Sequence, residues 1–124
     1  MLFAIALGGA AGTMARVGLG ALLAPWSGRF PYATLLINVS GSFAIGWLAG
    51  EGSPLASAPT MRLALTVGFC GGFTTFSAFS LETVRLIQRG EIGRAALYAA
   101  VSVLLSVGAA ALGLALSRTI GGGR

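Results

Sequence analysis

Four apolar stretches, each about as long as a membrane-spanning helix, dominate this sequence. They cover residues 1–23, 32–50, 61–85 and 93–116, and about 20 apolar residues are needed to cross the hydrocarbon core of a bilayer as a helix. The connections between them are short and rich in Pro, Gly and Ser, as turns require. We therefore predict an all-α membrane protein with four transmembrane helices in a single domain, residues 1–124.

Composition excludes several classes of function. Hydrophobic residues make up 56% of the chain and charged residues 9%, whereas a soluble domain carries about 25% charged residues. The eight basic residues are all arginines, mostly near the ends of the apolar stretches, so we expect no nucleic-acid partner. The chain has no His, no Asp and one Cys, Cys70. We therefore predict neither an enzyme nor a transition-metal site.

The loop charges hardly specify an orientation in the membrane. An even number of spans puts both termini and the loop at residues 53–59 on one side. That side has Arg62, Arg118 and Arg124. The other side has Arg29, Arg89 and Arg94, plus Arg85 if it reaches the interface. Because orientation follows Lys/Arg asymmetry, two interpretations stay open. Either other cues set one orientation, or both are inserted and pair as an antiparallel, dual-topology homodimer.

The third apolar stretch contains a segment that is unsuited to a continuous helix. Between Gly68 and Ser80 the sequence GFCGGFTTFSAFS has two adjacent glycines and two adjacent threonines. Glycine favours local unwinding, and backbone opened at membrane depth is tolerated only where protein buries it or a polar cavity adjoins it. We therefore predict a broken third helix, interrupted between Gly71 and Thr75, beside a site for something small and polar.

Aromatic and hydroxyl side chains alternate around the predicted break. The four phenylalanines have the spacing of one helical face: Phe69, Phe73, Phe76 and Phe79. The hydroxyl residues between and after them are Thr75, Ser77 and Ser80. A bare aromatic stripe is explained by packing or lipid contact, but ring edges carry positive partial charge and can solvate a small anion without trapping it. The interleaved hydroxyl donors favour an anion pathway.

Three other features place polar groups inside apolar stretches. Asn38 lies within the second stretch, where it either joins helices by hydrogen bonding or offers a neutral donor to an anion. Tyr98, Ser102 and Ser106 form one hydroxyl stripe along the fourth stretch. Arg16 lies within the first stretch, where it either snorkels to the interface or forms a vestibule charge that concentrates anions.

Three blocks of sequence resemble the Fluc (CrcB-type) fluoride channel family. The first is GGAAGTMAR, residues 8–16, which resembles a glycine motif ending in Arg. The second is TLLINVSGSF, residues 34–43, which resembles an Asn motif, and the third is the break at residues 68–80. Length and number of spans also match. The chain is thus identified as similar to this family over essentially its whole length.

The resemblance implies a fold, a function and a set of partners. The family forms antiparallel, dual-topology homodimers in the bacterial cytoplasmic (inner) membrane and lets fluoride leave the cell passively through pores at the dimer interface, which lowers cytoplasmic fluoride. The expected partners are the fluoride ion, a second copy of the chain and the lipid membrane. The resemblance also implies a structural Na+ at the dimer centre, held by the backbone carbonyls of Gly71 and Thr74 from both subunits.

The resemblance assigns roles to individual residues as well. Phe76 and Phe79 match pore-lining phenylalanines, and Arg16 matches a vestibule arginine. The other positions expected along the anion pathway are Asn38, Thr75, Ser77, Ser80, Tyr98, Ser102 and Ser106. Ala78 stands where the family commonly has Thr, so one hydroxyl is absent from the third-helix motif.

Two alternatives to a channel are a small exporter and a membrane scaffold. A small proton-coupled multidrug exporter needs a carboxylate embedded in the membrane, and the first two stretches contain none before Glu51. Only Glu82 lies inside a stretch, and it either pairs with Arg85 or with Arg16 of another helix, or lines an entrance. A membrane scaffold without transport is the third possibility, but it needs no interrupted helix.

Overall fold

The computed structural model describes residues 1–121 as helices joined by short connections. Four helical segments are long and apolar enough to cross a membrane, and they cover Leu2–Trp26, Tyr32–Ala49, Pro59–Gln88 and Ile92–Ile120. The prediction of an all-α protein with four membrane-spanning helices is therefore confirmed. The fourth segment extends beyond the predicted end at residue 116, because Ser117, Arg118 and Thr119 remain helical.

The individual elements subdivide these four segments. The first contains helix α1 (Leu2–Leu23) and a 3-10 turn, η1 (Ala24–Trp26), which has Pro25 near its start. The second is α2 (Tyr32–Ala49) and the fourth is α6 (Ile92–Gly121). The third contains, in chain order, α3 (Pro59–Leu63), the π-helical stretch η2 (Ala64–Cys70), α4 (Gly71–Phe73) and α5 (Phe76–Gln88).

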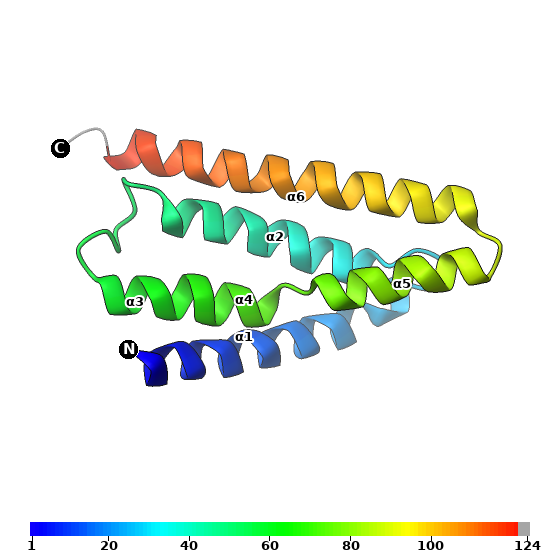
Figure 1. Ribbon diagram of the computed structural model, residues 1–124, viewed down its shortest axis with the longest axis horizontal. Coiled ribbons are helices and arrows are strands. Elements are labelled where there is room, and N and C mark those ends of the chain that lie inside the picture. Colours follow the sequence, from blue (N-terminus) through cyan, green and yellow to red (C-terminus); the bar gives the residue numbers. More distant parts are fainter. Residues whose placement is uncertain (122–124) are drawn as a thin grey trace.

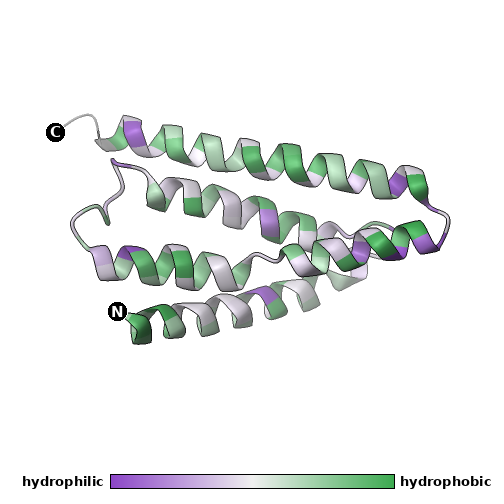
Figure 2. Cartoon of the chain, in the orientation of Figure 1, coloured by the Kyte–Doolittle hydropathy of each residue, from purple (hydrophilic) through white to green (hydrophobic). Residues whose placement is uncertain are grey.

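The four segments lie roughly parallel to one another, with both described ends of the chain at one end of the bundle (Figure 1). Helix α6 packs along α2, and the third segment lies between α2 and α1. Figure 2 shows that the helices are apolar over most of their length, with strongly hydrophilic residues gathered mainly towards their ends. The few polar groups at mid-depth therefore need partners inside the protein.

Helix α1 approaches the third segment closely through glycines. A Cβ added at Gly8 would collide with the carbonyl of Ala64, and one added at Gly12 would collide with the carbonyl of Phe69. On the facing segment, a Cβ at Gly72 would collide with the carbonyl of Gly9. Small residues at this spacing let membrane helices pack backbone to backbone.

Helices α2 and α6 pack in the same way. A Cβ at Gly46 would collide with the carbonyl of Ala110, and a Cβ at Gly113 would collide with the carbonyl of Phe43. Because hydrophobic burial gives little driving force inside a bilayer, such close backbone contact is a main source of stability there.

The third segment is interrupted at the threonines. Helix α4 ends at Phe73, Thr74 is extended with ψ 157°, and Thr75 is extended with φ −151° and ψ 109°. Gly71 keeps helical angles, φ −64° and ψ −38°, and Gly72 belongs to α4. The expectation that glycines unwind the helix was therefore wrong, because Gly72 instead makes the close contact with α1 described above.

The break also divides the aromatic stripe. Phe69 and Phe73 stack with ring centroids 5.8 Å apart, and Phe76 and Phe79 form a second, tilted pair at 5.4 Å. The prediction that all four rings share one helical face was wrong, because it assumed an uninterrupted helix between Phe73 and Phe76. Only the second pair lies on α5.

Apart from Arg16, which lies inside α1, the described arginines gather at the two ends of the bundle. Arg62, on α3, donates to the carbonyl of Ala49 at the end of α2, and Arg118 lies near the end of α6. The arginines at the opposite end are Arg29, Arg85, Arg89 and Arg94. Arg124 lies outside the described residues. The described residues thus have two arginines at the first end and four at the second, so only the sequence count that includes Arg124, three against four, is close to balance.

Candidate functional site

Asn38 on α2 binds both backbone groups of Thr75 at the centre of the break. Its Oδ1 accepts from the Thr75 N–H at 2.7 Å, and its Nδ2 donates to the Thr75 carbonyl at 3.1 Å. The Oδ1 atom therefore replaces the backbone acceptor that the Thr75 N–H has lost, and Nδ2 adds a second donor to a carbonyl that, as the N-cap carbonyl, already accepts the first hydrogen bond of α5. Without Asn38, the Thr75 N–H would lie unsatisfied at membrane depth, which is costly.

Arg16 and the Thr75 hydroxyl form hydrogen bonds with backbone groups on the two sides of the break. The Nε of the half-buried Arg16 donates to the Gly72 carbonyl at 3.1 Å, in place of the Phe76 N–H that a continuous helix would supply. Its positive charge also complements the carbonyl end of the preceding helix. On the other side, the Oγ1 of Thr75 accepts from the Ala78 N–H at 3.1 Å and caps α5.

Two carbonyls at the break have lost their helical donors. In a continuous helix the Thr75 N–H would bind the Gly71 carbonyl, and the Ala78 N–H would bind the Thr74 carbonyl. Both donors are instead engaged by side-chain oxygens, those of Asn38 and Thr75. The carbonyls of Gly71 and Thr74 are thus hard oxygen atoms without their helical partners, a donor type that suits a hard cation such as Na+.

A pocket of about 350 Å³ lies beside the break. It is formed between α2, the break, α5 and α6, and is lined mainly by apolar atoms. Among its lining residues are six of the predicted pathway residues, namely Asn38, Thr75, Phe76, Phe79, Ser102 and Ser106. Gly71 and Thr74 line it as well. Residues that are far apart in the sequence thus meet at one place.

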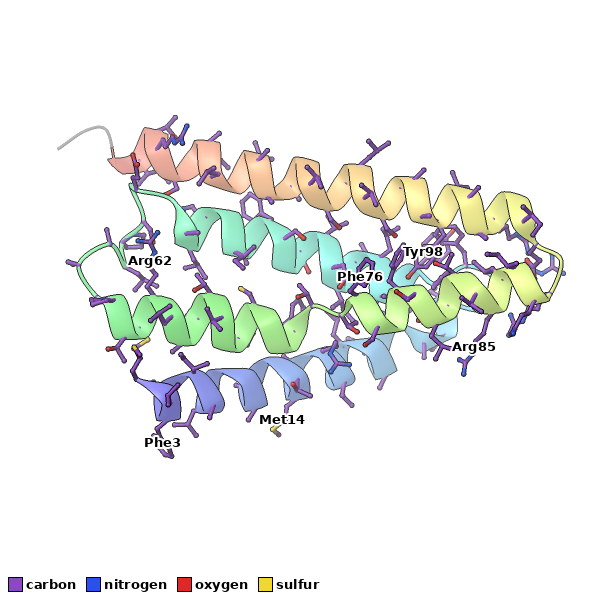
Figure 3. All side chains as sticks on the ribbon, viewed as in Figure 1. Phe3, Met14, Arg62, Phe76, Arg85 and Tyr98 are labelled. Carbon is purple, nitrogen blue, oxygen red and sulfur yellow. The ribbon has the colours of Figure 1, made fainter. Side chains whose placement is uncertain are left out.

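The pocket is lined by both aromatic and hydroxyl groups, of which Phe76 and Ser102 are examples. The Phe76 ring is 78% exposed in the single chain and lies immediately after the break (Figure 3). Ser102 is buried, and its Oγ has no hydrogen-bond partner among the described residues. A buried hydroxyl without a partner is unusual, so Ser102 offers a free donor to a bound species.

Tyr98 lies beneath the pocket and does not line it. It is fully buried, its ring centroid is 5.2 Å from that of Phe79, and its hydroxyl donates to Oε2 of Glu82 at 2.7 Å. The other oxygen of Glu82 accepts from the Thr34 hydroxyl at 2.8 Å. Of the two alternatives for Glu82, the ion pair with Arg85 or Arg16 is wrong: Arg85 points away from the bundle (Figure 3), and Arg16 binds the Gly72 carbonyl.

Ser77 and Ser80 lie on α5 but do not line the pocket. The Ser80 hydroxyl donates to the Phe76 carbonyl of its own helix at 2.9 Å. The Ser77 hydroxyl lies 3.3 Å from that of Thr75. Both hydroxyls therefore have local partners, as is common for Ser in membrane helices. Their contribution to an ion pathway stays a prediction.

The pocket also contains polar residues that the sequence reasoning missed. Ser42 lies one helical turn after Asn38, so the spacing along α2 was a usable signal for it. Cys70 is 1% exposed and lines the pocket from η2. No signal in the sequence placed it there, because its orientation depends on the π-helical stretch.

Comparison with known proteins gives one consistent result. The family model described as CrcB-like protein, Camphor Resistance (CrcB), matches residues 3–114. A fluoride-specific ion channel FluC of Rhodospirillum centenum is 52% identical over 121 residues, which is 96% of each chain. Proteins of the same name are 49% identical in Nitrobacter winogradskyi, over 96% of each chain, and 46% identical in Thermus thermophilus, over 95% of each chain.

These matches extend over almost the whole chain, including the break and every residue that lines the pocket. The resemblance seen in the three sequence blocks is therefore confirmed. The chain belongs to the CrcB family.

Proposed function

We propose that this protein is a fluoride-selective channel that lets fluoride leave the cell passively across the bacterial inner membrane. The observation that carries the proposal is the pocket at the helix break, where aromatic rings and neutral hydrogen-bond donors meet without a charged side chain in the lining. The names of the relatives, which are channels rather than enzymes, support the same function.

Neutral donors suit rapid passage of a small anion. Asn38 uses one N–H of its amide on the Thr75 carbonyl, which leaves the second N–H for the pocket. The edges of Phe76 and Phe79 and the hydroxyls of Ser102 and Ser106 add weak positive partial charges. Such groups replace water around a dehydrated ion without binding it so tightly that it cannot leave.

The exporter alternative finds less support. A proton-coupled exporter needs a carboxylate that faces its substrate. Glu82 is the carboxylate that lies inside an apolar stretch, but it does not line the pocket. Each of its oxygens accepts a hydrogen bond from a hydroxyl.

Passive conduction predicts a specific dependence on driving force. In liposomes that contain fluoride and KCl, a membrane potential set by valinomycin should drive fluoride efflux at equal pH on both sides. A fluoride electrode measures the release. A proton gradient alone, without valinomycin, should add little to the rate of fluoride efflux. Efflux that requires a proton gradient, or transport of an organic cation, would favour the exporter instead.

We place the complete pore at the interface of an antiparallel dimer. The pocket is open on one side in the single chain, and Phe76 is largely exposed there. A second copy would cover this opening. The loop charges of the sequence, three arginines on one side against four on the other, support insertion in both orientations.

Dual topology predicts that added charge at one end will reduce function. Ala56 and Ser57 are exposed in the loop between α2 and α3, so the variant Ala56→Lys/Ser57→Lys should hold that loop in the cytoplasm. Fluoride flux per protein should fall, because antiparallel partners become scarce. The neutral variant Ala56→Gln/Ser57→Gln is the control. Full flux from a population with one orientation, measured by protease access to a terminal tag, contradicts the antiparallel arrangement.

We also propose a structural Na+ at the dimer centre. The carbonyls of Gly71 and Thr74, whose helical donors are engaged elsewhere, would hold it, together with the same atoms of a second copy. When bound, the ion supplies positive charge that stabilises carbonyl dipoles from two broken helices. Asn38 and the Thr75 hydroxyl engage the helical donors of these carbonyls whether or not the ion is present.

A further inference from the structure

A hollow lined by arginines lies at the end of the bundle opposite to the chain ends. Its volume is about 510 Å³. Arg29 comes from the connection between α1 and α2, whereas Arg89 and Arg94 come from either side of the turn between α5 and α6. Two connections that are far apart in the sequence thus bring three guanidinium groups to one concave surface.

The charge at this hollow is only partly neutralised. Glu91 is the one carboxylate among its lining residues, and it forms an ion pair with Arg94. An adjoining hollow of about 200 Å³ shares Arg29 and Arg89 and adds Arg85 and Glu82. Both oxygens of Glu82 already accept hydrogen bonds, so it offers little compensation to the arginines.

The turn between α5 and α6 fixes this arrangement. Gly90 adopts φ +76°, a conformation that side-chain-bearing residues rarely take. The N–H of Gly90 donates to the Ile87 carbonyl, and that of Glu91 donates to the Leu86 carbonyl. The turn is therefore held by its own backbone, which leaves the guanidinium groups as the donors to any bound species.

We propose that this hollow binds the phosphate headgroup of an anionic phospholipid. Its position at the end of membrane-spanning helices places it at the level of lipid headgroups. Arginine binds phosphate oxygens with two parallel N–H donors. Ile92, which also lines the hollow, is 58% exposed and offers apolar surface next to the arginines. Charge beside apolar surface fits an amphiphile.

Size distinguishes this ligand from a halide ion. A hollow of about 510 Å³ is far larger than a single fluoride requires, and it has room for a phosphodiester with its glycerol. At the opposite end of the bundle, Arg62 is engaged with the Ala49 carbonyl. The inference does not depend on the proposed channel function.

Native mass spectrometry of the full chain in dodecyl maltoside tests the proposal. Dioleoyl phosphatidylglycerol should bind in preference to dioleoyl phosphatidylcholine at equal concentration. The variant R89Q/R94Q should lose most of this preference, because each arginine near a lipid surface contributes roughly a fivefold gain in binding. Arg118→Gln, which removes one charge at the other end of the bundle, is the control for the single variant Arg89→Gln, and it should keep the preference that Arg89→Gln weakens.

Further variants guard against misfolding. Glu91→Gln releases Arg94 from its ion pair and should raise phosphatidylglycerol binding, a gain that a misfolded protein would not show. R89K/R94K should retain much of the preference. Equal loss in Arg89→Gln and Arg118→Gln, or no preference between the two lipids, would overturn the proposal. Displacement of the lipid by an equal concentration of inorganic phosphate would assign the hollow to free anions and would overturn it as well.

Discussion

Replacement of Asn38 by Ala is expected to abolish most of the fluoride flux and to destabilise the protein. The substitution leaves the Thr75 N–H without its acceptor and removes the side-chain donor to the Thr75 carbonyl. A backbone group left unsatisfied in a buried place costs roughly 1–3 kcal/mol. A change of 1.4 kcal/mol already corresponds to a factor of about ten in an equilibrium. We therefore expect flux to fall by about tenfold or more, together with a lower unfolding temperature in detergent.

Two further variants test whether the loss of flux and stability comes from the hydrogen bonds of Asn38. Ser40→Ala is a matched control on the same helix, because the Ser40 hydroxyl bonds only carbonyls of α2 itself, those of Leu36 and Ile37. It should leave flux and stability nearly unchanged. Asn38→Asp keeps an acceptor for the Thr75 N–H and loses the donor to the Thr75 carbonyl, so it should be intermediate in stability. Full flux in Asn38→Ala would show that the break does not depend on this side chain.

Replacement of Phe79 by Leu is expected to reduce fluoride flux while the protein stays folded. Leucine keeps apolar volume but has no positive ring edge to face an anion. If that contact is comparable to other ion–ring contacts, roughly 1–2 kcal/mol, flux should fall by about five- to thirtyfold. A fluoride electrode on proteoliposomes measures the rate, and gel filtration measures the folded fraction.

The ring of Phe79 also packs against Phe76 and Tyr98, so a packing effect must be separated from an electrostatic one. Phe3→Leu makes the same chemical change at a ring that is 76% exposed near the start of α1, away from the pocket. It should leave the flux unchanged. Unchanged flux in Phe79→Leu would show that the ring of Phe79 contributes only to packing and not to the passage of the anion.

The sequence was sufficient to predict the four helices and the location of the interruption. Long apolar stretches leave few alternatives, because a bilayer accepts only structures that satisfy their own backbone groups. The meeting of Asn38, Thr75 and Ser102 at one pocket follows from polar residues placed at mid-depth in three different stretches. Such residues have to lie next to one another or next to a cavity.

The local geometry of the break was not predictable from residue types alone. Glycine propensity pointed to Gly71 and Gly72, but tertiary packing kept both in helical conformation and moved the break to the threonines. The contact of Arg16 with Gly72 depends on helix packing between residues more than forty positions apart in the chain. The contacts of Glu82 depend on two other helices, α2 and α6. Neither relation leaves a periodic signal in the sequence.

The most direct measurement of the central claim compares fluoride with chloride in the same liposomes. Wild-type protein is reconstituted with both anions inside, a potential is set with valinomycin, and two selective electrodes record release together. The neutral donors and ring edges of the break-side pocket predict rapid fluoride efflux with chloride largely retained. Equal release of the two anions, or no fluoride release beyond that of protein-free liposomes, would contradict a fluoride-selective pathway at this helix break.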